Sequence, residues 1–241
     1  MDASPHLPQQ LELLRSVVSR ALPGPLPSSI FLTHCHWGHY AGLGWLGKES
    51  ADARGLPLYL TPDQAGFLRE NRPWRDLLER GNLALRLLVG ETPVPVEDSI
   101  SITPRWVDHR RDAADTVAYQ VDFRDLSQRV LYMPDVDSLD PLALDLIASS
   151  QVAVIDGTFY RPGELKSRGR RAQEVPHPFI SRDLDRLEKL LGRTRIVFTH
   201  FNHTNPAGDE GSPEARALVD RGFQLAADGM VVAGFGGSAR P

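Results

Sequence analysis

The sequence predicts an α/β protein with one domain over residues 1–241, and three observations carry this prediction. Short apolar runs of strand length alternate with segments whose apolar residues recur at helical spacing. The chain has 241 residues, 41% of them hydrophobic and 24% charged, so it can bury a core without disulfide bonds. No internal repeat or linker-like composition divides it.

Helices are expected where apolar residues recur every three or four positions or where a capping residue comes first. Thr61 before Pro62 is a typical helix start, with Thr61 as N-cap and Pro62 in the first turn. Ser181 is expected to cap a later helix in the same way. The predicted helices are 11–21, 40–48, 61–70, 74–80, 140–149, 181–191 and 212–222.

Strands are expected at short runs of apolar, β-branched and aromatic residues. Between two of them, residues 160–178 are polar and basic and are predicted to form a flexible loop. The predicted strands are 30–32, 58–60, 83–89, 100–107, 116–123, 130–133, 152–155, 196–198 and 223–233.

Charge and composition exclude several functional classes. The net charge of −4 gives no electrostatic basis for binding nucleic acid. The one cysteine, Cys35, excludes an internal disulfide and a cysteine-built zinc site, and a free buried thiol is expected. No apolar run approaches the roughly 18 residues that a membrane helix needs, and no signal peptide is visible. A cytoplasmic protein without membrane partners is therefore expected.

Five predicted strands are each followed by residues that can bind a metal ion. Because ligands of α/β proteins bind at the carboxyl ends of strands, these residues are expected to converge. They are His34, His36 and His39, then His109, Asp135, Asp156, and finally His200 with His203.

Ordinary structural roles remain open at each of these positions. The histidine loop can be a solvent-exposed loop, and His109 and His200 can be packed histidines without a ligand. Asp135 can be a turn or N-cap residue, and Asp137 and Asp140 lie close to it.

The segment Thr33-His34-Cys35-His36-Trp37-Gly38-His39 resembles the His-X-His-X-Asp-His signature of the metallo-β-lactamase superfamily. Residues 197–206, 209–214 and 227–230 resemble one family within it, coenzyme PQQ synthesis protein B (PqqB), as do residues 1–5, 108–110, 131–135 and 155–159. The resemblance implies an αββα sandwich that lacks its first N-terminal strands. An edge strand exposed in this way invites pairing, so a homo-oligomer is expected.

The resemblance also implies the metal ligands. His34, His36 and His109 correspond to the first metal site, Asp135 to the bridging carboxylate, and His39 and His200 to the second site. Gly38 stands where the second-site aspartate belongs, so one Fe²⁺ or Zn²⁺ ion is expected rather than two.

The implied function is metal-dependent hydroxylation of a tyrosine-derived precursor in the biosynthesis of pyrroloquinoline quinone (PQQ). Asp135, His177 and His203 are candidate catalytic residues. Arg110, Asn202 and Asn205 are candidate contacts for a small amino-acid-derived substrate, although Asn205 before Pro206 is equally a turn residue. Basic residues with the same candidate role, or simply a solvated surface, are Arg111, Lys166, Arg168, Arg170 and Arg171. Two other functions stay open: hydrolysis of phosphodiesters or esters on the same scaffold, and non-catalytic carriage of PQQ or its precursor.

Overall fold

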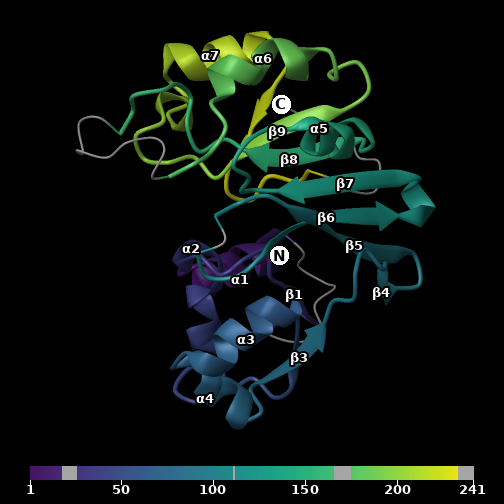
Figure 1. The fold of residues 1–241 in the computed structure, drawn as a ribbon, viewed down its shortest axis with the longest axis vertical. Coiled ribbons are helices and arrows are strands. Elements are labelled where there is room, and N and C mark those ends of the chain that lie inside the picture. The colour runs from purple at the N-terminus through teal and green to yellow at the C-terminus, as the bar shows by residue number, and fades with distance from the viewer. Residues whose placement is uncertain (18–25, 111, 166–174, 233–241) are drawn as a thin grey trace. The chain divides into compact units, whose positions relative to one another are not determined.

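The computed structural model describes residues 1–17, 26–110, 112–165 and 175–232, and it divides into two compact units (Figure 1). Unit 1 consists of residues 1–92 and 110–117, and unit 2 of residues 93–109 and everything from 118 onward. The mixed α/β class is confirmed. That one domain spans residues 1–241 stays a prediction. Parts of three predicted elements lie outside the described residues, namely 18–21, 166–174 and 233.

Unit 1 contains a three-stranded parallel sheet in the order β1-β2-β3. Leu58 at the centre pairs with Ile30 on one side and Leu85 on the other. Helices and a 3₁₀ helix provide the rest of its core, in which Leu43, Leu58 and Leu68 are fully buried. The elements of this unit are β1 (Ile30–Phe31), β2 (Leu56–Leu60), β3 (Leu83–Leu87), α1 (Leu7–Val17), α2 (Trp37–Tyr40), α3 (Pro62–Glu70), α4 (Trp74–Glu79) and the 3₁₀ helix η1 (Ala41–Leu46).

The start of α3 connects the helix to the loop that follows β1. Thr61 and Gln64 form the predicted N-cap as a full capping box, in which the Thr61 side chain accepts from the Gln64 amide at 3.2 Å. Gln64 Nε2 also donates to the carbonyls of Thr33 at 2.9 Å and Asp115 at 3.1 Å. One buried amide therefore fixes both a helix start and the backbone before the histidine loop.

Unit 2 contains a seven-stranded mixed sheet in the order β10-β9-β8-β7-β6-β5-β4 (Figure 1). The strands β7 to β10 are parallel, whereas β6 pairs with β7 and β4 with β5 in antiparallel fashion. The first two residues of β6 fall in unit 1. The elements are β4 (Val94–Glu97), β5 (Ile100–Val107), β6 (Thr116–Phe123), β7 (Gln128–Met133), β8 (Val152–Asp156), β9 (Arg195–Thr199), β10 (Gln224–Leu225), α5 (Pro141–Ala148), α6 (Ile180–Glu188), α7 (Pro213–Asp220) and the 3₁₀ helices η2 (Arg124–Leu126) and η5 (Pro206–Gly208).

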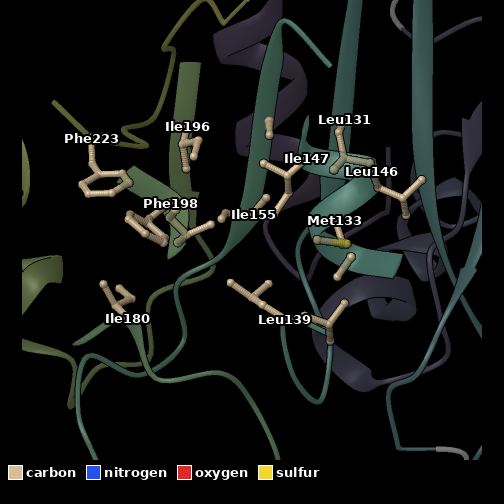
Figure 2. Close-up of a cluster of buried hydrophobic side chains, with 14 of the residues drawn as sticks. Leu131, Met133, Leu139, Leu146, Ile147, Ile155, Ile180, Ile196, Phe198 and Phe223 are labelled. Atoms are coloured by element: carbon tan, nitrogen blue, oxygen red, sulfur yellow. The ribbon is translucent and has the colours of Figure 1, made fainter. Parts of the chain in front are cut away.

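The core of unit 2 lies against one face of this sheet. Ile155 of β8 and Phe198 of β9 point into it, together with Ile147 of α5 and Ile180 of α6 (Figure 2). Alternate residues of the same strands, such as Val154 and Val197, pack on the opposite face. Both faces of the central strands are therefore covered, as parallel strands require.

Several local predictions were wrong in detail. Helix α1 begins at Leu7, before the predicted start at residue 11, and the predicted strand 223–233 is reduced to β10, because residues 226–232 are not extended into the sheet. Residues 40–48 do not form one helix, because the chain changes at Ala41 into η1. Helix α6 begins at Ile180 with Phe179 as N-cap, so Ser181 is not the cap; its amide donates to the Tyr160 carbonyl instead. The predictions omitted β4, whose Pro95 reads as a strand breaker but is accommodated in an outermost strand.

The structure contains no helix, within its described residues, of the length and apolarity that crossing a membrane requires.

Candidate functional site

The histidine loop of unit 1 gathers three imidazoles from six consecutive residues. Its backbone leaves β1, turns at His36 and enters α2, which carries His39. The ring centroid of His34 lies 4.5 Å from that of His36 and 4.0 Å from that of His39. The structure thus brings together all three predicted ligands of this unit.

A single carboxylate from the start of the chain orients this loop. Asp2 Oδ1 accepts from the Thr33 amide at 2.7 Å, and the Thr33 hydroxyl lies 3.0 Å from both Asp2 oxygens. Asp2 Oδ2 accepts from His39 Nδ1 at 2.9 Å. The side chains of Asp2 and His39 are only 7% and 8% exposed, so water competes little for this contact.

These contacts set the tautomers of two imidazoles. A carboxylate only accepts, so His39 carries its proton on Nδ1 and presents the lone pair of Nε2. The Thr33 hydroxyl gives its one proton to Asp2, so its oxygen accepts from His34 Nδ1 at 3.0 Å. His34 therefore also presents Nε2. Imidazoles oriented in this way are prepared to bind a metal ion through Nε2.

His36 is held through its other nitrogen. Its Nε2 lies 2.9 Å from Asp112 Oδ1, while Arg110 donates to Asp112 Oδ2 at 2.7 Å. Burial alone would raise the pKa of Asp112, but the hydrogen bonds from His36 and Arg110 outweigh it and lower the pKa to about 2. Asp112 is thus a stable anion, and the ligand atom left to His36 is Nδ1.

Cys35 is a free, buried thiol, as predicted. Burial, followed by the negative charges of Asp115 and Asp63, raises its pKa to about 12. A thiol that stays protonated is a poor metal ligand, so the loop offers nitrogen ligands only.

Unit 2 takes three candidate ligands from strand ends, His109 after β5, Asp135 after β7 and His200 after β9, and a fourth, His177, from the segment before α6. His109, Asp135 and His177 are all buried, and their ligand atoms lie within 4.8 Å of one another. Asp135 Oδ1 is 3.7 Å from His109 Nε2 and 3.8 Å from His177 Nδ1. His200 Nε2 lies 3.5 Å from the other oxygen, Asp135 Oδ2. Asp135 is therefore the centre around which three imidazoles are placed.

Each of these imidazoles has its own hydrogen-bond partner, which lies behind the ring in His109 and His200, whereas His177 bonds its partner through the same Nδ1 that faces Asp135. His109 Nδ1 donates to Asp137 Oδ1 at 3.1 Å, which leaves Nε2 facing Asp135. His200 Nδ1 bonds the Thr158 hydroxyl at 2.9 Å. His177 Nδ1 bonds Asp156 Oδ2 at 2.7 Å. Partners of this kind fix ring orientation at metal sites.

Asp156 is the most buried of these partners, and it binds backbone as well. Its two oxygens accept from the amides of Thr158 at 2.8 Å and Val136 at 3.1 Å. Burial alone would lower the pKa of His177, but the hydrogen bond to Asp156 and the charges of Asp156 and Asp135 outweigh it and raise the pKa. Without a metal ion His177 therefore holds a proton more firmly than a free histidine does.

His200 has a backbone φ of +61°, in the left-handed region that residues other than glycine seldom adopt. The residue directly follows β9, so the turn bends its side chain back toward Asp135 at the end of β7. Backbone strain of this kind concentrates at functional sites.

The donor set and spacing of unit 2 fit a divalent metal ion. Two ligand atoms bound at roughly 2.0–2.2 Å to one tetrahedral zinc ion lie roughly 3.3–3.6 Å apart. The distances from Asp135 to His109 and His200, 3.7 and 3.5 Å, are close to this value. Imidazole and carboxylate together suit Zn²⁺ and Fe²⁺.

The remaining predicted residues have other contacts. The Asn205 side chain is buried, caps η5 by accepting from the Ala207 amide at 2.8 Å and donates to the Gly157 carbonyl, which matches the turn alternative. Asn202 donates to Thr204 Oγ1 at 2.6 Å, and His203 is exposed. Arg110 is engaged with Asp112. Arg111 and the basic residues 166–171 lie outside the described residues.

The sequence reasoning missed the orienting residues Asp2, Thr33, Asp112 and Thr158, and it noted Asp137 and Asp156 without their partners. Asp2 and Thr33 lie in the segments that carried the family resemblance, which was the available signal. Nothing in the local sequence marks Asp112, because it is 76 positions away from His36.

A family model described as the beta-lactamase superfamily domain matches residues 1–201. Coenzyme PQQ synthesis protein B of Pseudomonas protegens is 33% identical over 148 residues, which are 58% of this chain and 48% of that protein. The same protein of Cupriavidus necator is 27% identical over 253 residues, covering 97% of this chain and 82% of the relative. In the Pseudomonas matches the chain thus spans about half the length of the relative.

Two solved structures share the fold. Zn²⁺-bound PqqB from Methylobacterium extorquens has a TM-score of 0.79 at 21% identity, over 95% of this chain and 81% of that one. A diphosphatase of the PhnP family has a TM-score of 0.61 at 16% identity, over 95% and 76%. Since the family model covers most of the sequence and the fold agrees, the chain belongs to the beta-lactamase superfamily.

Proposed function

We propose that this chain is a metal-dependent enzyme of the PqqB type that acts in the cytoplasm in PQQ biosynthesis and hydroxylates a tyrosine-derived precursor. The observation that carries the metal dependence is the carboxylate of Asp135, which faces Nε2 of both His109 and His200, while each of these rings is held through Nδ1 by another residue. The similarity to coenzyme PQQ synthesis protein B supports the pathway.

The proposed metal ligands are those that the family resemblance assigns in both units. The ring orientations support them, because His34, His39 and His109 each present Nε2 as a lone pair. One ion, Fe²⁺ or Zn²⁺, is proposed, since Gly38 supplies no side chain. The full set is His34, His36, His39, His109, Asp135 and His200.

The bound ion would supply the activation of dioxygen or water, and the protein groups would handle substrate and protons. His177 is the proposed proton carrier, because Asp156 holds its ring 3.8 Å from Asp135. Exposed His203 is a further candidate for proton exchange, and Arg110 and Asn202 for contacts with substrate carboxylates or amides.

Metal content is the test of this proposal. The full chain is purified anaerobically without chelator and analysed for iron and zinc, and then assayed for oxygen uptake with a Glu–Tyr dipeptide. About one iron per chain with dipeptide-dependent oxygen uptake supports hydroxylation. A folded chain that takes up neither metal overturns the proposal and favours a carrier.

A second candidate function, hydrolysis of phosphodiesters or esters, is favoured by one observation. The two oxygens of Asp135 face two different imidazoles, His109 and His200, as expected of a carboxylate that bridges two ions. Two-ion sites stabilise the attacking and leaving oxygens of a displacement. Two zinc ions per chain, with turnover of bis(p-nitrophenyl) phosphate and no oxygen uptake, would select this function.

A further inference from the structure

Two of the segments that carried the family resemblance lie side by side in unit 2: the segment after β8, with Gly157 and Thr158, and the loop after β9. The Gly157 amide donates to the Thr199 carbonyl at 2.8 Å, and the Asn202 amide donates to the Thr158 carbonyl at 3.1 Å. His200 lies between these two contacts along the loop. Its left-handed backbone is therefore flanked on both sides by hydrogen bonds to one short segment.

The close approach of the two segments depends on the glycine at position 157. A Cβ on Gly157 would lie 2.8 Å from the Thr199 carbonyl oxygen and 3.0 Å from Phe198 Cβ, which is too close for a side chain. Glycine is the residue that allows one backbone to come this near to another. The missing side chain is thus what allows the segment after β8 to bond the loop around His200.

The buried side-chain amide of Asn205 joins the same two segments at a third point. Its Nδ2 donates to the Gly157 carbonyl at 2.6 Å, and its Oδ1 accepts from the Ala207 amide at 2.8 Å. A backbone carbonyl only accepts and a backbone amide only donates, so these contacts fix the orientation of the side chain. Asn205 is 5% exposed, so water competes little for either hydrogen bond. The hydrogen bond from Asn205 to Gly157 therefore tethers the loop to the segment after β8.

Thr158 extends this restraint to the ring of His200. The Thr158 hydroxyl lies 2.9 Å from His200 Nδ1, while Nε2 of the same ring lies 3.5 Å from Asp135 Oδ2. A ring that is held at one nitrogen keeps its other nitrogen aimed in one direction. Movement of the segment that carries Thr158 would therefore turn the nitrogen that faces Asp135.

We propose that Asn205 is a positioning residue for His200: its tether to Gly157 holds the segment that carries Thr158, and Thr158 holds the imidazole. The consequence for metal binding rests on the proposed function, whereas the tether itself acts in the metal-free protein. In this role Asn205 acts on the site without contacting the substrate.

Nuclear magnetic resonance of the His200 imidazole in the metal-free full chain tests the tether. Asn205→Asp keeps the oxygen that caps η5 but loses the donor to Gly157, and Thr158→Val removes the hydroxyl beside the ring. Both variants are expected to shift the nitrogen signal of His200 Nδ1 toward that of His6, which is exposed. Thr158→Ser keeps the hydroxyl and should keep the signal near its wild-type position.

Asn82→Asp is the matched control for a general loss of stability. Asn82 is 3% exposed and, like Asn205, donates its side-chain amide to a backbone carbonyl, that of Ala53 at 2.8 Å, but it belongs to unit 1. This variant is expected to destabilise the chain and to leave the His200 signal unchanged. Circular dichroism establishes that each variant is folded. Asn205→Ser is measured beside Asn205→Asp, since a serine oxygen can also cap a helix start and brings no charge.

Zinc affinity, measured by chelator competition, shows whether the tether affects a metal ligand. Asn205→Asp is expected to weaken zinc binding roughly 10-fold, at the lower end of what loss of a supporting residue costs. The same change combined with His200→Ala should cause no further loss than His200→Ala alone, because the tether acts through that ring.

An unchanged His200 signal in Asn205→Asp and Asn205→Ser overturns the tether, as does an equal shift in Asn82→Asp. A further loss of zinc affinity when Asn205→Asp is added to His200→Ala also overturns it, since Asn205 would then act on the site by another route. A shifted signal with unchanged zinc affinity supports the tether and rejects His200 as a ligand, which counts against the proposed function alone.

Discussion

The histidine loop of unit 1 and the cluster of unit 2, formed by His109, Asp135, His177 and His200, offer similar candidate metal ligands. The two regions bring these ligands together in different ways. The loop takes three imidazoles from six consecutive residues, His34 to His39. The cluster takes its groups from positions as far apart as His109 and His200, and the strand order of the sheet brings these two and Asp135 together. The first arrangement depends on local conformation, whereas the second depends on the fold of the whole unit.

The two regions also differ in how their rings are held. In unit 1 the carboxylate of Asp2 supports His39 directly and His34 through Thr33. In unit 2 each ring has a separate partner, so loss of one leaves the others in place. A shared support makes the loop the more vulnerable of the two regions.

The largest expected effect comes from the centre of the unit 2 cluster. Asp135→Ala removes the carboxylate that faces three imidazoles and is expected to reduce zinc affinity by more than roughly 100-fold, beyond what loss of an outer partner costs. Chelator competition measures the affinity. Asp145→Ala, an exposed change on α5, is the control and leaves affinity unchanged. Near-normal zinc binding by Asp135→Ala would contradict the role of Asp135 as a ligand.

The next effect compares the two kinds of support. Asp2→Asn and Asp137→Asn each weaken zinc binding by roughly 10- to 100-fold, with the larger loss in Asp2→Asn. The reason is that Asp2 orients two imidazoles and has a side chain only 7% exposed, whereas Asp137 orients one and is 38% exposed. The visible spectrum of the cobalt-loaded proteins reports the ligand geometry independently of affinity. A larger loss of zinc affinity in Asp137→Asn than in Asp2→Asn would contradict the view that the shared support of unit 1 is the more vulnerable one.

A smaller effect is expected when the missing carboxylate is restored. Gly38→Asp places a side chain in open space, and the backbone there has no positive φ that would strain it. The free energy of unfolding should therefore change by no more than about 0.5 kcal/mol. The zinc content per chain should rise, because the loop gains an oxygen ligand. Gly44→Asp is the matched control, since that glycine also has open space and lies outside the loop. A rise in both variants would show that added charge alone attracts zinc.

The smallest effect serves as a baseline outside both regions. The hydrogen bond from Arg221 lowers the pKa of Glu188 below its ordinary value of 4.5. A carboxyl whose folded pKa is depressed adds stability above about pH 4.5, and this stability is lost as the pH falls through the folded pKa. The side chains of Arg221 and Glu188 are 35% and 36% exposed, so water screens the pair and Glu188→Gln should lower the Tm only slightly at pH 7 and low salt. The difference should vanish in acid or high salt, and zinc content should not change. A large loss of stability would contradict this assignment.

Local patterns predicted the secondary structure well where it depends on local residues. The bounds of β5 and β6 and the Thr61 cap are confirmed. The Ser181 cap failed because the preceding chain is held by Phe159, through the pairing of that residue with Phe179. Such a tertiary contact leaves no mark in the residues around the helix start.

In the candidate site, too, the sequence predicted some residues and not others. Strand-end reasoning identified Asp135, Asp156 and His200, because parallel neighbours end at one edge of a sheet. The partners of the rings were not predictable, since Asp2 and His39 are 37 positions apart and His36 and Asp112 are 76 apart. Nothing in the pattern of hydrophobic residues records a hydrogen bond over that distance.

The left-handed backbone of His200 lets a mutational scan distinguish the requirement for stable folding from the requirement for an imidazole at this position. Glycine and asparagine accept a φ near +61° more readily than other residues do, so the scan should rank them among the best-tolerated substitutions by abundance. The same two residues remove the imidazole and should rank among the worst by metal-dependent growth selection. Position 200 would then stand out as a site where abundance and fitness scores diverge in opposite directions.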